Sequence, residues 1–104
     1  MNNYFKKKIK ELLKKAQEEF DVEDYINALL TFNQVLAIDE KNYEAYFGMY
    51  QSWYAYCYSI KEDSPMINDL FRSAYRVAPN KLKDDYLLAF EQDRKALKNI
   101  IDEK

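Results

Sequence analysis

The stretch Asp24–Ile38, DYINALLTFNQVLAI, opens on a carboxylate and then repeats apolar residues three and four positions apart. Residues with this spacing share one face of an α-helix, so the stretch predicts an amphipathic helix ending near Ile38. Asp21, Glu23 and Asp24 precede it, where negative charge stabilises a helix N-terminus. The apolar face consists of Tyr25, Ala28, Leu29, Phe32, Val35 and Leu36.

The segment before it, Tyr4–Phe20, has the same periodicity, with lysines on its other faces. It predicts a first amphipathic helix. Its apolar residues are Phe5, Ile9, Leu12, Leu13, Ala16 and Phe20.

Three more helices are predicted downstream. Asn42 is expected to cap a third helix from Tyr43, Ser64-Pro65 is a strong start signal for a fourth, and a fifth occupies residues 81–102. Rings and other apolar residues of the third helix cover an arc of about 200°, which places it at the centre of the domain. No segment alternates with period two, so the predicted fold class is all-α with five helices and no sheet.

The composition removes several classes of chemistry. The 104 residues suit one domain and include one Gly and no His, which excludes phosphate-cradling glycine loops and the commonest general base. Cys57 is the only thiol, so an intrachain disulfide and a multi-cysteine zinc site are excluded, and we interpret Cys57 as a small core residue. We expect no cofactor, no metal and no catalytic residue.

The charge and hydropathy patterns bear on partners. A net charge of −2 gives no general attraction for nucleic acid, and no apolar run approaches the length of a membrane span. The lysines of residues 1–15 are mixed through the segment, unlike a secretory signal. A cytoplasmic location is therefore the expectation.

Repeated spacing of packing residues points to a family. Asp24–Leu29 and the ending Leu36–Asp39 resemble the second helix of a tetratricopeptide repeat, in which small residues let helices approach and rings fill the gaps beside them. A second, degraded copy has Tyr50 in place of a small residue and about five additional residues around Ser59–Ser64. The matching positions are Leu12, Ala16, Tyr25, Ala28, Phe32 and Val35, and then Tyr46, Met49, Phe71, Ala74 and Val77–Asn80.

The resemblance implies a right-handed superhelical stack of antiparallel helix pairs, at 4–38 and 43–78, followed by a capping helix at 81–102. It also implies a concave groove, lined by the first helix of each pair, that holds a segment of another protein. Leu13, Gln17 and Gly48 stand where the family's clamp for acidic C-terminal tails has other residues, which argues against that ligand. The implied groove comprises Lys10, Leu13, Lys14, Gln17, Glu44, Phe47, Gly48, Gln51, Tyr54 and Ala55, with Tyr86 and Leu87 as an extension.

Other interpretations stay open at this point. The rings of the groove are also accounted for by simple core packing, and a ring-rich domain of this size suits a self-associating module or homodimer. Eighteen acidic residues also allow a small helical enzyme that uses a carboxylate pair, although nearly all lie on predicted polar faces. A basic N-terminal face suits an acidic partner, anionic lipid or nucleic acid, but equally a merely solvated surface; it comprises Lys6, Lys7, Lys8, Lys10, Lys14 and Lys15.

Overall fold

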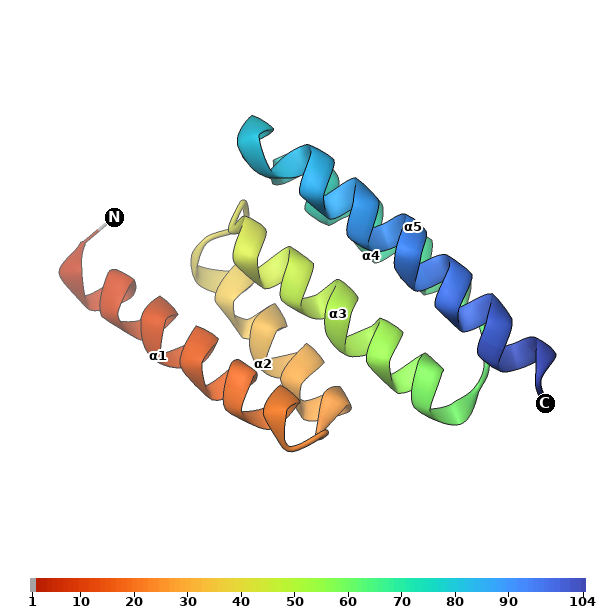
Figure 1. Ribbon diagram of the computed structural model, residues 1–104. Helices are drawn as coiled ribbons and strands as arrows, with labels where there is room; N and C mark the ends of the chain where they lie inside the picture. The colour runs from red at the N-terminus through yellow and green to blue at the C-terminus, as the bar shows by residue number, and fades with distance from the viewer. Residues whose placement is uncertain (1) are drawn as a thin grey trace.

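The structure is a computed structural model that describes residues 2–104, and within these residues it contains five α-helices and no strand (Figure 1). The all-helical class and the number of helices agree with the prediction, and each helix begins and ends close to its expected bounds. The helices are α1 (Asn3–Asp21), α2 (Tyr25–Ile38), α3 (Tyr43–Ile60), α4 (Pro65–Val77) and α5 (Asn80–Asp102).

Side-chain caps determine where two of the helices begin. Asn42 Oδ1 accepts the Ala45 N–H at 2.9 Å at the start of α3. Ser64 Oγ accepts the Met66 N–H at 3.2 Å at the start of α4, where Pro65 occupies the first helical position. Each cap satisfies an amide that has no partner within its helix, as the sequence predicts.

Left-handed residues end α1 and α3. Glu23 has φ 64° and Lys61 has φ 58°, a conformation that glycine adopts more easily than any residue with a Cβ. In each case the following N–H returns to a carbonyl five residues earlier, which closes the helix end. These bonds join Asp24 N to Glu19 O at 2.9 Å and Glu62 N to Cys57 O at 3.1 Å.

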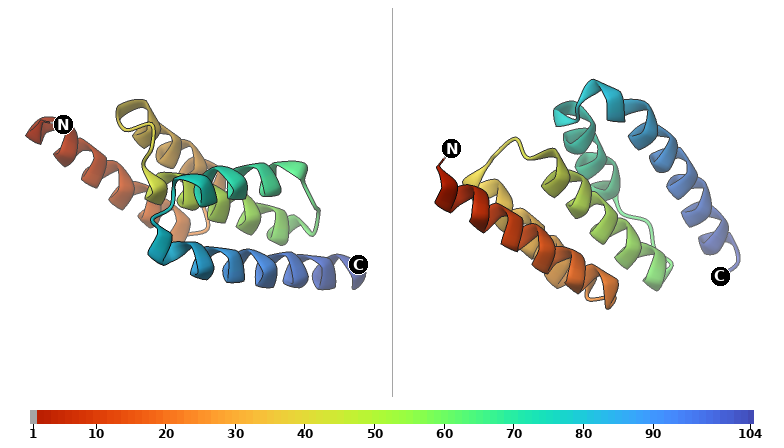
Figure 2. Two further views of the ribbon diagram at one scale, coloured as in Figure 1. Left: turned by 90° about the horizontal axis from the view of Figure 1, so that it is seen from above. Right: turned by 60° about the vertical axis from the view of Figure 1, so that its left-hand side comes forward.

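The helices alternate in direction along the chain. In Figure 1, α1, α3 and α5 run the same way, and α2 and α4 return in the opposite direction. The helix α2 packs against both α1 and α3, α4 packs against α3, and α3 contacts all four other helices, as its wide apolar arc predicts. Seen from above, α2 and α5 lie on opposite sides of α3 (Figure 2).

Small residues bring α1, α2 and α3 close together. Ala16, Ala28 and Ala45 are fully buried, one on each helix. The ring of Phe32 lies directly on Gly48, where a Cβ atom would come within 2.6 Å of three ring atoms. This contact requires the glycine, and it carries α2 against the middle of α3.

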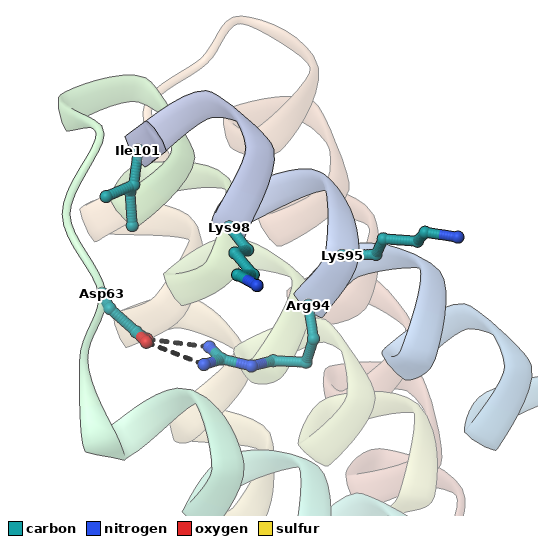
Figure 3. A pocket seen from close by; sticks show the side chains of 5 residues that line it. All are labelled: Asp63, Arg94, Lys95, Lys98 and Ile101. Atoms are coloured by element: carbon teal, nitrogen blue, oxygen red, sulfur yellow. Dashed lines mark hydrogen bonds and ion pairs between the residues drawn. The ribbon is translucent and has the colours of Figure 1, made fainter. Parts of the chain in front are cut away.

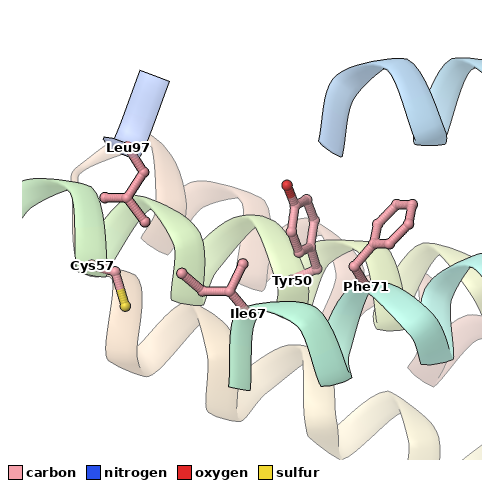
Figure 4. Close-up of a cluster of buried hydrophobic side chains, with 5 residues drawn as sticks. All are labelled: Tyr50, Cys57, Ile67, Phe71 and Leu97. Atoms are coloured by element: carbon pink, nitrogen blue, oxygen red, sulfur yellow. The ribbon is translucent and has the colours of Figure 1, made fainter. Parts of the chain in front are cut away.

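A second core joins α3, α4 and α5 (Figure 4). Tyr50 is fully buried at its centre, and Cys57 is buried as expected. The helix α5 is held through rings: Phe90 stacks on Phe71 at 4.1 Å between centroids. The core consists of Tyr50, Cys57, Ile67, Phe71 and Leu97.

Candidate binding groove

Side chains of α1, α3 and α5 surround a hollow of about 210 Å³, here called the proximal hollow. The stacked rings of Phe47 and Tyr86, 3.9 Å apart and nearly parallel, form one wall. Phe32 and Gly48 contribute where α2 approaches α3. The lining consists of Leu13, Gln17, Phe32, Glu44, Phe47, Gly48, Gln51 and Tyr86.

The polar groups of this hollow come from two helices. Gln17 Nε2 donates to Asp21 Oδ1 at 2.9 Å, one turn further along α1. Gln51 and Glu44 are exposed on α3. The hollow thus combines rings with carboxamide and carboxylate groups able to accept hydrogen bonds.

A second hollow, of about 490 Å³ and here called the distal hollow, lies further along α3. It extends from the turn between α1 and α2 across α3 to α5. Tyr54 and Tyr58 stand one turn apart on α3 with ring centroids 6.0 Å apart. The lining consists of Glu23, Tyr25, Tyr54, Ala55, Tyr58, Ser59 and Ala96.

Two tyrosines of these hollows, Tyr54 and Tyr86, have a raised pKa and are neutral at physiological pH. Burial raises the pKa of Tyr54 to about 12, and the negative charge of Asp93 adds to this effect. Burial likewise raises the pKa of Tyr86. Both phenols therefore present a ring face and a neutral hydroxyl to whatever enters the groove.

The α3 residues of the two hollows form one continuous stripe. Glu44, Phe47/Gly48, Gln51, Tyr54/Ala55 and Tyr58/Ser59 recur every three to four residues. Residues with this spacing lie along one face of a helix. We call the combined surface of the proximal and distal hollows the groove.

The structure brings most of the predicted groove residues together. The proximal hollow is lined by Leu13, Gln17, Glu44, Phe47, Gly48, Gln51 and Tyr86. Tyr54 and Ala55 line the distal hollow instead. Lys10, Lys14 and Leu87 are exposed and line neither hollow.

Several residues of the distal hollow were not anticipated. Tyr58 and Ser59 follow Tyr54 and Ala55 by one helical turn, so continuing the predicted stripe along α3 was enough to find them. Glu23 and Tyr25 belong to the turn after α1 and the start of α2, and Ala96 belongs to α5. Spacing within one helix does not reveal that these segments meet at the distal hollow.

Asp93 is a partly buried carboxylate that the sequence patterns did not single out. It accepts the Tyr50 hydroxyl at Oδ2 (2.7 Å). Burial raises the pKa of Asp93 while the hydrogen bond from Tyr50 lowers it, and burial and Asp93 together raise the pKa of Tyr50. This pair joins α3 to α5 within the second core, and residues 2–104 contain no group of three His, Cys, Asp or Glu side chains placed to hold a metal ion.

A separate hollow of about 510 Å³ lies between α5 and the connection from α3 to α4 (Figure 3). Arg94 donates to both oxygens of Asp63 at 2.8 and 2.7 Å, so its charge is already neutralised. This ion pair lowers the pKa of Asp63. Lys95 and Lys98 are exposed beside it, and Ile101 completes the lining.

The chain matches no protein-family model, no curated protein sequence and no solved structure with which it was compared. Among the helices of residues 2–104, none combines the length and the apolarity needed to cross a membrane. The geometry of the groove is therefore the basis for a functional proposal.

Proposed function

We propose that the protein is a non-enzymatic binding module that holds a segment of another polypeptide along the groove of α1, α3 and α5. The observation that supports this proposal is that residues far apart in the sequence surround two hollows on one continuous stripe of α3. Helices α2, α3 and α5 line both hollows, α1 adds to the proximal one, and the turn after α1 adds to the distal one. An extended segment laid along α3 would contact both hollows at once.

The chemistry of the lining suits such a segment. Rings such as Phe47, Tyr54 and Tyr86 provide large contact area while losing little conformational entropy on binding. Gln17 and Gln51 supply carboxamides that both donate and accept, which matches the alternating N–H and C=O groups of an extended backbone.

The resemblance to tetratricopeptide repeats supports the same proposal. In the predicted repeat arrangement α1 and α3 are the first helices of the two pairs, which is where that family presents its groove, and α5 is the capping helix that extends it. Membership of that family, and a right-handed superhelical stacking of the pairs, are parts of this proposal.

Self-association is a second candidate, favoured by apolar side chains on the outer face of α2. Ile26 and Leu30 stand one turn apart and are 40% and 53% exposed. A homodimer through this face predicts a concentration-dependent sedimentation coefficient that Leu30→Glu abolishes.

Selection of peptides from a random 12-residue display library tests the groove directly. The variant Gln51→Lys/Tyr54→Ala changes the polar centre of the groove and one ring of the distal hollow. We expect peptides enriched on the wild-type protein to lose at least tenfold in affinity for this variant. Trp53 Nε1 donates to Ser64 Oγ at 3.0 Å, outside both hollows, so labelled peptides are the better readout.

The matched control is Gln34→Lys/Tyr4→Ala, which repeats the same chemical changes at exposed positions outside the groove. It should retain wild-type affinity, and circular dichroism should show that both double variants remain folded. Equal affinity of the wild-type protein and the groove variant, or no enrichment on the wild-type protein, would refute the proposal.

A further inference from the structure

Each hollow of the groove carries one formal charge, and in both cases it is a carboxylate. Of the part of the chain that the structure describes, Glu44 alone contributes a charged side chain to the proximal hollow and Glu23 alone to the distal one. Both glutamates are exposed, so an incoming cation can reach them.

The aromatic rings beside these carboxylates also attract a positive charge. Tyr25, Tyr54 and Tyr58 line the distal hollow, and the faces of aromatic rings carry negative electrostatic potential that attracts ammonium and guanidinium groups. Such a contact occurs elsewhere in the described residues, where Lys83 Nζ lies 4.5 Å from the centroid of Tyr75. A carboxylate at the edge of several tyrosine rings is a suitable site for a lysine or arginine side chain.

The basic side chains near the groove do not cancel this potential. Arg94 is held by both oxygens of Asp63. On α1, Lys10 precedes Leu13 and Lys14 lies between Leu13 and Gln17, but both lysines are exposed and neither lines a hollow.

The distance between the two hollows predicts how far apart the basic side chains of a bound segment would be. Their α3 residues, Glu44–Gln51 and Tyr54–Ser59, are centred about nine positions apart, which corresponds to about 14 Å along a helix. An extended chain advances about 3.3 Å per residue, so side chains four positions apart on a bound segment would reach the two hollows.

We propose that the groove holds an extended segment of another polypeptide that carries two basic side chains four positions apart, one in each hollow. This inference rests on the function proposed above and names the chemistry of its partner.

Fluorescein-labelled pools of 12-residue peptides test the inference. All pools are randomised over uncharged residues except at two fixed positions: arginine at 4 and 8, arginine at 4 and 6, glutamate at 4 and 8, or alanine at 4 and 8. We expect the immobilised protein to retain the first pool at least fivefold more than each of the others. Equal retention of the two arginine pools would overturn the spacing.

Isosteric removal of the two charges tests the role of the hollows. In Glu23→Gln/Glu44→Gln, retention of the first pool should fall to that of the alanine pool. The control Glu40→Gln/Glu91→Gln makes the same change of charge at exposed glutamates outside the groove and should retain the pool as the wild-type protein does. Unchanged retention by Glu23→Gln/Glu44→Gln would overturn the inference.

The remaining outcomes separate this inference from the proposed function. Preferential retention of the alanine or glutamate pool, lost in Gln51→Lys/Tyr54→Ala, would uphold a peptide groove and refute its basic partner. Retention of no pool would refute both. If the protein self-associates and Glu23→Gln/Glu44→Gln abolishes this self-association, the basic partner would be the lysine-rich α1 of a second copy of the chain and not another polypeptide.

Discussion

The two halves of the molecule join their helices in different ways. Between α1, α2 and α3 the contacts are made by small residues, with Gly48 beneath the ring of Phe32. Between α3 and α5 they are made by rings, such as Phe47 stacked on Tyr86. Small residues let helix backbones approach, whereas rings hold them apart, so the groove is open on the side where α5 stands off from α3.

The difference predicts distinct responses to substitution. The small-residue interface should tolerate almost no added volume, because a Cβ at Gly48 has no free space. The ring interface should depend on the few polar bonds that orient α5, among them the one from Tyr50 to Asp93. The following predictions test this contrast, from the largest expected effect to the smallest.

Gly48→Ala should produce the largest loss of stability. Alanine gains about 1 kcal/mol over glycine within a helix. Its Cβ would, however, lie 2.5 Å from the buried Phe32 ring, and overpacking of this kind commonly costs about 1–3 kcal/mol and occasionally more. We expect a net loss of about 2 kcal/mol in the free energy of unfolding, measured with urea.

The smaller side chain of Phe32→Leu provides the control for this prediction. In that background Gly48→Ala should cost clearly less than in the wild-type protein, because two of the three ring atoms that its Cβ would meet, Cε1 and Cζ, are gone. A Gly48→Ala protein at least as stable as the wild-type protein would mean that the two interfaces do not differ in their tolerance of volume.

Tyr50→Phe tests the ring interface while keeping the ring. The substitution removes the hydroxyl that donates to Asp93 Oδ2 and leaves a partly buried carboxylate without this donor. Loss of one partner of such a bond costs about 1–3 kcal/mol, and we expect about 1.5 kcal/mol by urea unfolding. Amide hydrogen exchange should quicken in α5 and remain unchanged in α2, since α2 lies outside this interface; equal acceleration in both would count against separate interfaces.

The left-handed residues at the ends of α1 and α3, one in each half of the molecule, allow two comparable substitutions with smaller expected effects on stability. Glu23 and Lys61 both hold a left-handed conformation at a helix end, and glycine relieves that strain. Glycine also gives the unfolded chain more freedom, which offsets part of this gain. We therefore expect Glu23→Gly and Lys61→Gly each to stabilise the protein by about 0.5–1 kcal/mol. Thermal unfolding followed by circular dichroism provides the measurement.

Only one of these two variants should affect binding. Glu23 lines the distal hollow and Lys61 does not, so Glu23→Gly should weaken retention of the peptide pool with arginines at positions 4 and 8 while Lys61→Gly leaves it unchanged. Identical retention by both variants would remove Glu23 from the groove chemistry.

Features that depend on a single helix could be predicted from the sequence. The starts of α3 and α4 follow from Asn42 and Ser64 because a cap is a local interaction. The resemblance to tetratricopeptide repeats pointed to most residues of the proximal hollow, because the groove positions that it implies lie on α1 and α3.

The features that were missed depend on tertiary contacts. Tyr25 and Ala96 meet at the distal hollow only because α5 is placed by rings, and no spacing within one helix encodes that placement. The conformation of Glu23 depends on how the chain turns after α1. Asp93 was the exception with a visible signal, because a carboxylate among Phe90 and Leu97 interrupts an apolar stripe.

The smallest expected effect is a pH dependence of opposite sign at two carboxylates of the ring interface. Burial raises the pKa of Asp93, so its folded form binds a proton more readily than the unfolded chain, whose Asp pKa is about 3.9. Its contribution to stability is therefore complete below that value and is lost as the pH rises through the folded pKa. The ion pair with Arg94 lowers the pKa of Asp63, so the contribution of Asp63 is present above the unfolded pKa and lost as the pH falls.

Asparagine at either position removes the titration while keeping an oxygen that accepts hydrogen bonds. As the pH rises from 4 to 7, the stability of the wild-type protein should fall relative to Asp93→Asn and rise relative to Asp63→Asn. Each change should stay below about 1 kcal/mol, because both carboxylates remain partly accessible to solvent. A rise of the wild-type stability in both comparisons would instead show that the Tyr50 hydroxyl stabilises a charged Asp93 by a charge-assisted hydrogen bond. Asp93 would then contribute to the binding of α5 through its charged form, as Asp63 does, and not as a poorly solvated carboxyl.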